Sequence, residues 1–66
     1  MDDKEKLKVL LEHWIEHNDE HSEEFSEWAQ KAAASGQKAA ADSISAAVES
    51  LKQASQSLNN ALKQLG

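Results

Sequence analysis

Gly36 is the only strong helix breaker inside this 66-residue chain, because there is no proline and the other glycine is Gly66. Residues that favour helices fill the chain from Asp3 to Ala34 and again from Gln37 onward. A glycine after an alanine-rich helix end takes the left-handed conformation that closes the last turn. The sequence therefore predicts a single all-α domain over 1–66, with helices at 3–34 and 37–65 and a turn at 35–36.

Each predicted helix carries an apolar stripe whose members are spaced alternately by four and three residues, as in a heptad seam. The first stripe is Leu7, Leu11, Trp14, Asn18, His21, Phe25, Trp28 and Ala32, and the second is Ile44, Val48, Leu51, Ser55, Leu58, Leu62 and Leu65. A short break between long helices predicts an antiparallel hairpin, with residues level when their numbers sum to about 71. Trp28 would then face Ile44, and Asn18 would face Ser55.

The chain has few large side chains to bury. Apolar residues make up 39% of it, and 11 of them are alanine. No disulfide can compensate, because there is no cysteine. Domains this small are usually stabilised by a metal or by association. We therefore expect two hairpins to pair into a homodimeric four-helix bundle.

Charge and composition exclude several classes of partner. The net charge of −5 and the pI near 5.0 argue against binding to nucleic acid or to anionic membranes. No apolar run approaches the roughly 20 residues that span a bilayer. The mixed-charge start from Met1 to Lys6 does not resemble a signal peptide, so we expect a cytoplasmic protein.

Three histidines form the one pattern that points to chemistry. His13, His17 and His21 lie one helical turn apart, and two histidines so spaced can hold one metal ion. We expect His21 in the seam, His17 on its flank and His13 farther out, with His17 and His21 as the first ligands. Glu20 and Glu24 lie on the same side of the helix and could assist as carboxylate ligands.

Nitrogen and oxygen ligands suit zinc, nickel or cobalt without selecting among them. The outer two histidines of a straight helix are about 12 Å apart along its axis, so a complete site needs ligands from elsewhere, such as a second copy of the chain. Protons compete for imidazole, so acidification should weaken binding. The predicted function is reversible metal binding for storage, delivery or sensing, without catalysis.

Two other interpretations remain open. His21 and Asn18 could form a buried polar layer that fixes the register of a purely structural or protein-interaction module. The stretch from His13 to His17 also matches the His-x-x-Glu-His string of some zinc peptidases. That chemistry needs a third ligand and a substrate cleft, which a short hairpin does not provide, so we do not expect an enzyme.

The stretch from His13 to Phe25 resembles a small uncharacterised helical domain of archaea and anaerobic bacteria. The shared signature is His-Trp-x-x-His-Asn-x-x-His, followed four residues later by an aromatic residue. Trp28, Gly36 and the leucines of the second helix are similar to the rest of that pattern. The domain is similar to tails on nickel or cobalt uptake proteins, which implies transition-metal handling and a metal-transport partner.

Overall fold

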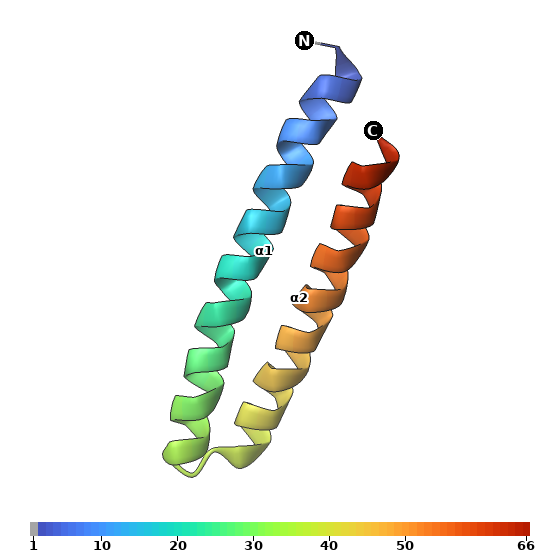
Figure 1. The fold of residues 1–66 in the computed structure, drawn as a ribbon. Helices are drawn as coiled ribbons and strands as arrows, with labels where there is room; N and C mark the ends of the chain where they lie inside the picture. The colour runs from blue at the N-terminus through green and yellow to red at the C-terminus, as the bar shows by residue number, and fades with distance from the viewer. Residues whose placement is uncertain (1) are drawn as a thin grey trace.

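The computed structural model describes residues 2–66, which form two antiparallel helices packed side by side (Figure 1). Helix α1 spans Asp3–Ala34 and helix α2 spans Lys38–Gln64. The prediction of an all-α fold with two helices is confirmed, and the described residues contain no strand. The Cα extents are 51 × 16 × 11 Å, so the molecule is a flat layer about one helix thick.

The ends of α1 follow from its sequence. The Asp2 carboxylate accepts a hydrogen bond of 2.9 Å from the Glu5 backbone N–H, which caps the first turn. Asp3 and Glu5 in the first turn and Lys31 in the last turn have the charges that the helix dipole favours. At residue 36, Gly36 has a φ of 85°, as its position after the alanines predicts.

Two backbone hydrogen bonds close the C-terminus of α1. The Gly36 N–H donates to the Ala33 carbonyl at 3.1 Å, and the Gln37 N–H donates to the Ala32 carbonyl at 2.8 Å. These are the two bonds of a Schellman motif. Since Gln37 takes part in that motif, α2 starts at Lys38 and the turn is one residue longer than expected from the sequence.

The buried seam between the helices is rotated relative to the predicted stripe. Its most buried members are Leu11, Ser22, Ala29, Ala41, Val48 and Ser55. Trp14 and Trp28 are 42% and 57% exposed, and His21 is exposed, so the prediction that these three lie in the seam is wrong. The physical reason is that only one edge of the α1 stripe packs on α2. The other edge lies on an uncovered face of the hairpin, where a bundle of four helices would have a further helix.

Two polar contacts set the register. The Ser55 hydroxyl donates to the Asp19 carboxylate at 3.1 Å, and the Lys8 ammonium donates to the Gly66 carbonyl at 3.4 Å. The residue numbers of both pairs sum to 74, one more than the 73 of the expected pair Asn18–Ser55 and about three more than the turn position predicts. The expected pairing of Asn18 with Ser55 is therefore shifted by one residue to Asp19. The additional turn residue, Gln37, contributes to this shift.

Candidate metal site

The three histidines lie along an exposed edge of α1 and outside the seam. Uninterrupted helix places them one turn apart, so their rings follow one another along the surface. The ring centres of His13 and His17 are 4.2 Å apart, and those of His17 and His21 are 6.3 Å apart. Phe25 continues the row, with its ring centre 6.1 Å from that of His21. The row is therefore continuous but unevenly spaced.

The spacing distinguishes the two histidine pairs. With metal–nitrogen bonds of about 2.1 Å, two imidazoles on one ion have ring centres about 4.6 Å apart at an octahedral angle and about 5.3 Å apart at a tetrahedral angle. The 4.2 Å between His13 and His17 is close to the octahedral distance, whereas the 6.3 Å between His17 and His21 is beyond both distances. Geometry therefore favours His13 with His17, although the sequence alone favoured His17 with His21.

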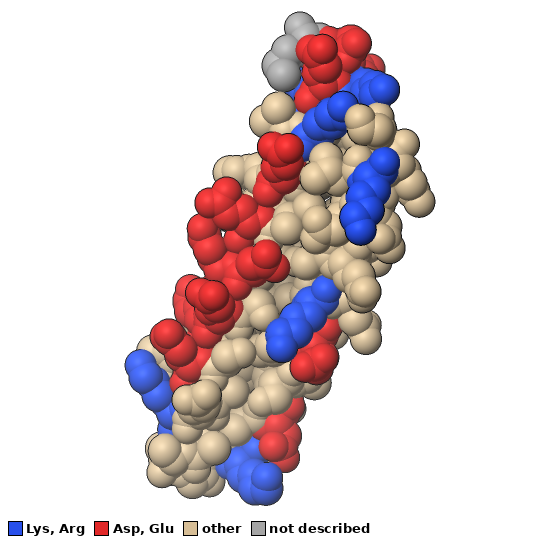
Figure 2. Space-filling view, viewed as in Figure 1, with Lys and Arg blue, Asp and Glu red and all other residues tan. Residues whose placement is uncertain are grey.

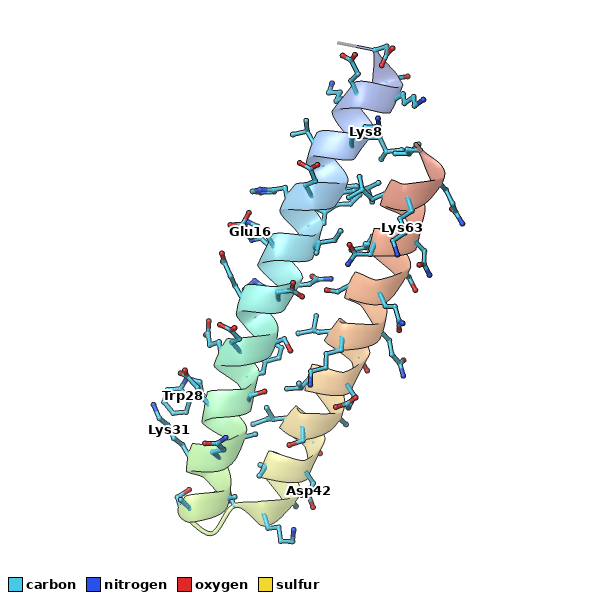
Figure 3. The ribbon with its side chains drawn as sticks, viewed as in Figure 1. Lys8, Glu16, Trp28, Lys31, Asp42 and Lys63 are labelled. Atoms are coloured by element: carbon cyan, nitrogen blue, oxygen red, sulfur yellow. The ribbon has the colours of Figure 1, made fainter. Side chains whose placement is uncertain are left out.

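The electrostatic environment of the row is strongly acidic. Between Val9 and Gln30 the chain has seven acidic residues and no lysine or arginine. Figure 2 shows acidic side chains following α1 along one face of the molecule, and Figure 3 shows Glu16 projecting from the outer side of this helix. In the part of the chain that the structure describes, the lysine–carboxylate ion pairs lie within α2, at Lys38–Asp42 and Lys52–Glu49. The acidic surface around the histidines thus attracts cations.

One chain supplies an incomplete ligand set. Within residues 2–66 no group of three or more histidine, aspartate and glutamate side chains is arranged to hold one metal ion. Glu20 and Glu24 are exposed on α1, and neither joins the close pair of imidazoles into such a group. A metal bound at His13 and His17 would therefore need water or a second molecule for its remaining ligands.

The polar contact in the seam involves residues that the sequence analysis did not pair. Ser55 is buried and bonds to Asp19, and Ser22 is also buried in the same part of the seam. Asn18 is half-buried, and His21 lies outside the seam. The period of the stripe could not reveal the role of Asp19, because that residue lies beside the stripe among several other acidic residues.

Three surface hollows of the hairpin are not lined by any of the three histidines. Two of them are near the turn, with volumes of about 480 and 330 Å³, and Trp28 and Ile44 line both. A third hollow, of about 390 Å³, lies across the seam and is lined by Ala29 and Val48 among others. None of these hollows is lined by His13 or His17, so the His-x-x-Glu-His string does not border a cleft at any of them.

No helix among the described residues has the length and hydropathy that crossing a bilayer requires.

Comparisons with known proteins give one match. No curated protein and no solved structure matches the chain significantly. One family profile covers residues 7–65, which include the histidine row, the turn and all of α2. The chain therefore belongs to the family described as "Domain of unknown function (DUF8180)".

Proposed function

We propose that this protein reversibly binds a divalent transition metal through His13 and His17. The observation that carries the proposal is the 4.2 Å between the two ring centres on an exposed, rigid helix. Both side chains are exposed, so small rotations can bring the two nitrogens onto one ion without disturbing the seam. The seven acidic residues between Val9 and Gln30 raise the local cation concentration.

The proposed ligand set remains open to exchange. Zinc, nickel and cobalt all accept imidazole nitrogen with carboxylate or water oxygen. His21, Glu20 and Glu24 are the additional candidates along the row. Two protein ligands with water in the other positions hold a metal more loosely than a closed structural site does. This favours delivery or sensing over permanent storage, with a cytoplasmic metal-transport protein as the partner and without catalysis.

We further propose that the functional unit is a homodimer. The hairpin has four buried apolar side chains, two of which are alanine, and no large side chain is fully buried among the described residues. Association would supply the core that a single layer lacks.

Calorimetric titration with Zn²⁺, Ni²⁺ and Co²⁺ tests the metal proposal. We expect micromolar or tighter binding by the wild type, and a loss of at least tenfold in affinity for His17→Ala and for His13→Ala. His21→Ala is the comparison variant, because the His21 ring centre is 6.3 Å from that of His17, and it should weaken binding less than His13→Ala does. Circular dichroism would show whether each variant keeps its helices.

The possible outcomes separate the interpretations. If His21→Ala weakens binding as much as His17→Ala does while His13→Ala has no effect, the pair is His17 with His21 and the favoured geometry is wrong. If none of the three metals binds the wild type more tightly than it binds the double variant His13→Ala/His17→Ala, metal binding at this row is wrong.

A further inference from the structure

The hairpin has one face on which both helices present uncovered, mostly apolar side chains. On a straight helix, residues seven apart point within about 20° of each other and form a column. The two columns that flank the seam on this side are together called the open face. They are Leu7, Trp14, His21 and Trp28 on α1, and Ala40, Ala47, Ala54 and Ala61 on α2.

The exposure of these columns contrasts with that of the seam. Leu7, Trp14 and Trp28 are 38%, 42% and 57% exposed, so the largest apolar side chains of α1 lie outside the core. On α2 the column Ala41, Val48, Ser55 and Leu62 meets α1, while Ala47, Ala54 and Ala61 lie beside it and are only half-buried. The leucines between these two columns, such as Leu51 and Leu58, are half-buried as well. The open face is therefore a second apolar surface, which α1 and α2 do not cover for each other.

The open face has a raised side and a recessed side. By the register of the seam, Trp28 lies within one residue of level with Ala47, as do His21 with Ala54 and Trp14 with Ala61. At each of these levels α1 contributes a large ring and α2 contributes a methyl group. The hollow of about 330 Å³ beside Trp28, lined by Ile44 and Ala47, is part of this recess. A surface with a ridge on one half and a trough on the other can fit a copy of itself.

The exposed area indicates how much surface remains to be covered. A compact monomer of 7.3 kDa exposes about 4,200 Å² by the scaling for globular proteins. This hairpin exposes 4913 Å². The excess, about 700 Å², is close to the roughly 800 Å² that each partner buries in a standard interface. The radius of gyration is 15.2 Å, compared with about 11 Å for a compact chain of this length. The single hairpin is therefore too extended to cover its own apolar surface.

We propose that the open face is the contact surface of the dimer, and that a second copy lies on it with its α1 over the first copy's α2. A two-fold axis parallel to the helices produces this arrangement and keeps residues level. The ring column of each copy then enters the alanine column of the other, because alanine lets two helices approach closely. Each helix has antiparallel neighbours, as in an up-and-down four-helix bundle. This inference rests on the homodimer proposed above but not on the metal.

The polar borders of the open face agree with this pairing. The next column on α2 is Ser43, Ser50, Ser57 and Gln64, and all four are exposed. The next column on α1 contains His17, Glu24 and Lys31, which are also exposed, and begins with Leu10, which is 38% exposed and extends the apolar surface. In the proposed pairing these two borders meet, so small uncharged side chains lie opposite charged ones and no like charges are forced together. His13, one column farther out, stays accessible with His17 at the rim.

Sedimentation equilibrium in the presence of a chelator tests the proposed surface. At micromolar concentration we expect twice the 7.3 kDa of one chain. The variant Ala47→Glu/Ala54→Glu places two charges in the alanine column. It should raise the dissociation constant of the dimer at least tenfold. The matched control Gln53→Glu/Ser56→Glu adds the same charge on the solvent-exposed side of α2 and should remain dimeric.

Cysteine pairing tests the symmetry, since the chain has no native cysteine. A mixture of His21→Cys and Ala54→Cys chains should give the mixed disulfide in preference to the His21→Cys homodisulfide. Preferential homodisulfide formation would place α1 over α1 and overturn the pairing. If the wild type is a monomer, the proposed contact surface is wrong. It is also wrong if the Gln53→Glu/Ser56→Glu control dissociates as much as the Ala47→Glu/Ala54→Glu variant does. The His13→Ala/His17→Ala variant should remain dimeric, so failure of the metal proposal would not affect this result.

Discussion

The hydroxyl of Ser55 donates a 3.1 Å hydrogen bond to the carboxylate of Asp19, across the middle of the seam between α1 and α2. Ser55 is 7% exposed, so water can replace this acceptor only in part. We expect Asp19→Ala to lower the free energy of unfolding by about 1 kcal/mol, the usual contribution of such a bond. Urea denaturation of Asp19→Ala, Ser55→Ala and the double variant measures the coupling between the two residues. Purely additive effects would contradict a specific interaction.

Leu11 is the most buried apolar side chain, at 3% exposure. Truncation to alanine leaves a cavity in the seam, so Leu11→Ala should lower the free energy of unfolding by about 2 to 5 kcal/mol. Val9→Ala is the control, because Val9 is 53% exposed and should contribute less than about 0.5 kcal/mol. Equal losses for the two variants in chemical denaturation would show that the seam is not where the structure has it.

Gly36 has a φ of 85°, and a Cβ added there would meet no atom within 4 Å. The cost of Gly36→Ala is therefore due to the left-handed backbone alone, and we expect about 1 to 2 kcal/mol of destabilisation. Gly36→Asn should cost less, since asparagine tolerates this conformation. Thermal denaturation should rank the three proteins as Gly, Asn and Ala in falling midpoint, with Gln37→Ala as a neighbouring control at negative φ.

Association should make thermal stability depend on concentration. If two hairpins share a core, dilution favours the separated and unfolded chains, and the unfolding midpoint should fall on dilution. Trp28→Ala should lower the midpoint by several degrees, more than its 57% exposure in the single hairpin would suggest. An unchanged midpoint over a hundredfold dilution would contradict a folding-coupled dimer.

Protons and metal ions compete for the same imidazole nitrogens, so metal affinity should fall as the pH falls. Between about pH 7.5 and about pH 5.5 we expect at least a tenfold loss in the affinity for Ni²⁺ or Zn²⁺. Calorimetry at both pH values, with His13→Ala/His17→Ala as the control, measures this loss. If the metal affinity does not change with pH and is the same in His13→Ala/His17→Ala, the metal binds to carboxylates and not to these two histidines.

The sequence predicted the helices well because their limits depend on local residues. Asp2 caps α1, Gly36 ends it, and no proline interrupts either helix. The phase of the seam was harder to predict. An apolar stripe that includes both Leu11 and Trp14 does not reveal which edge of the stripe packs on the neighbouring helix, since that depends on the partner's position and not on the period.

The geometry of the histidine row could be predicted only in part, for a similar reason. The seven residues from His13 to Asp19 fix which side chains share an edge of α1, but the distance between two rings depends on their rotamers. Sequence spacing treats His13–His17 and His17–His21 as equivalent, whereas the ring centres are 4.2 and 6.3 Å apart. Likewise, the hydrogen bond of Asp19 depends on a register that the composition of the turn does not fix.

The hairpin is a layer only one helix thick, with a shortest Cα extent of 11 Å. Even the most buried side chains of such a layer lie close to its surface, so each residue that holds the two helices together is within one turn of an exposed residue. A substitution that strengthens the inside therefore reshapes the outside. The side chains that hold the helices together therefore lie directly beside those that other molecules can contact, and a substitution in either set can displace the other.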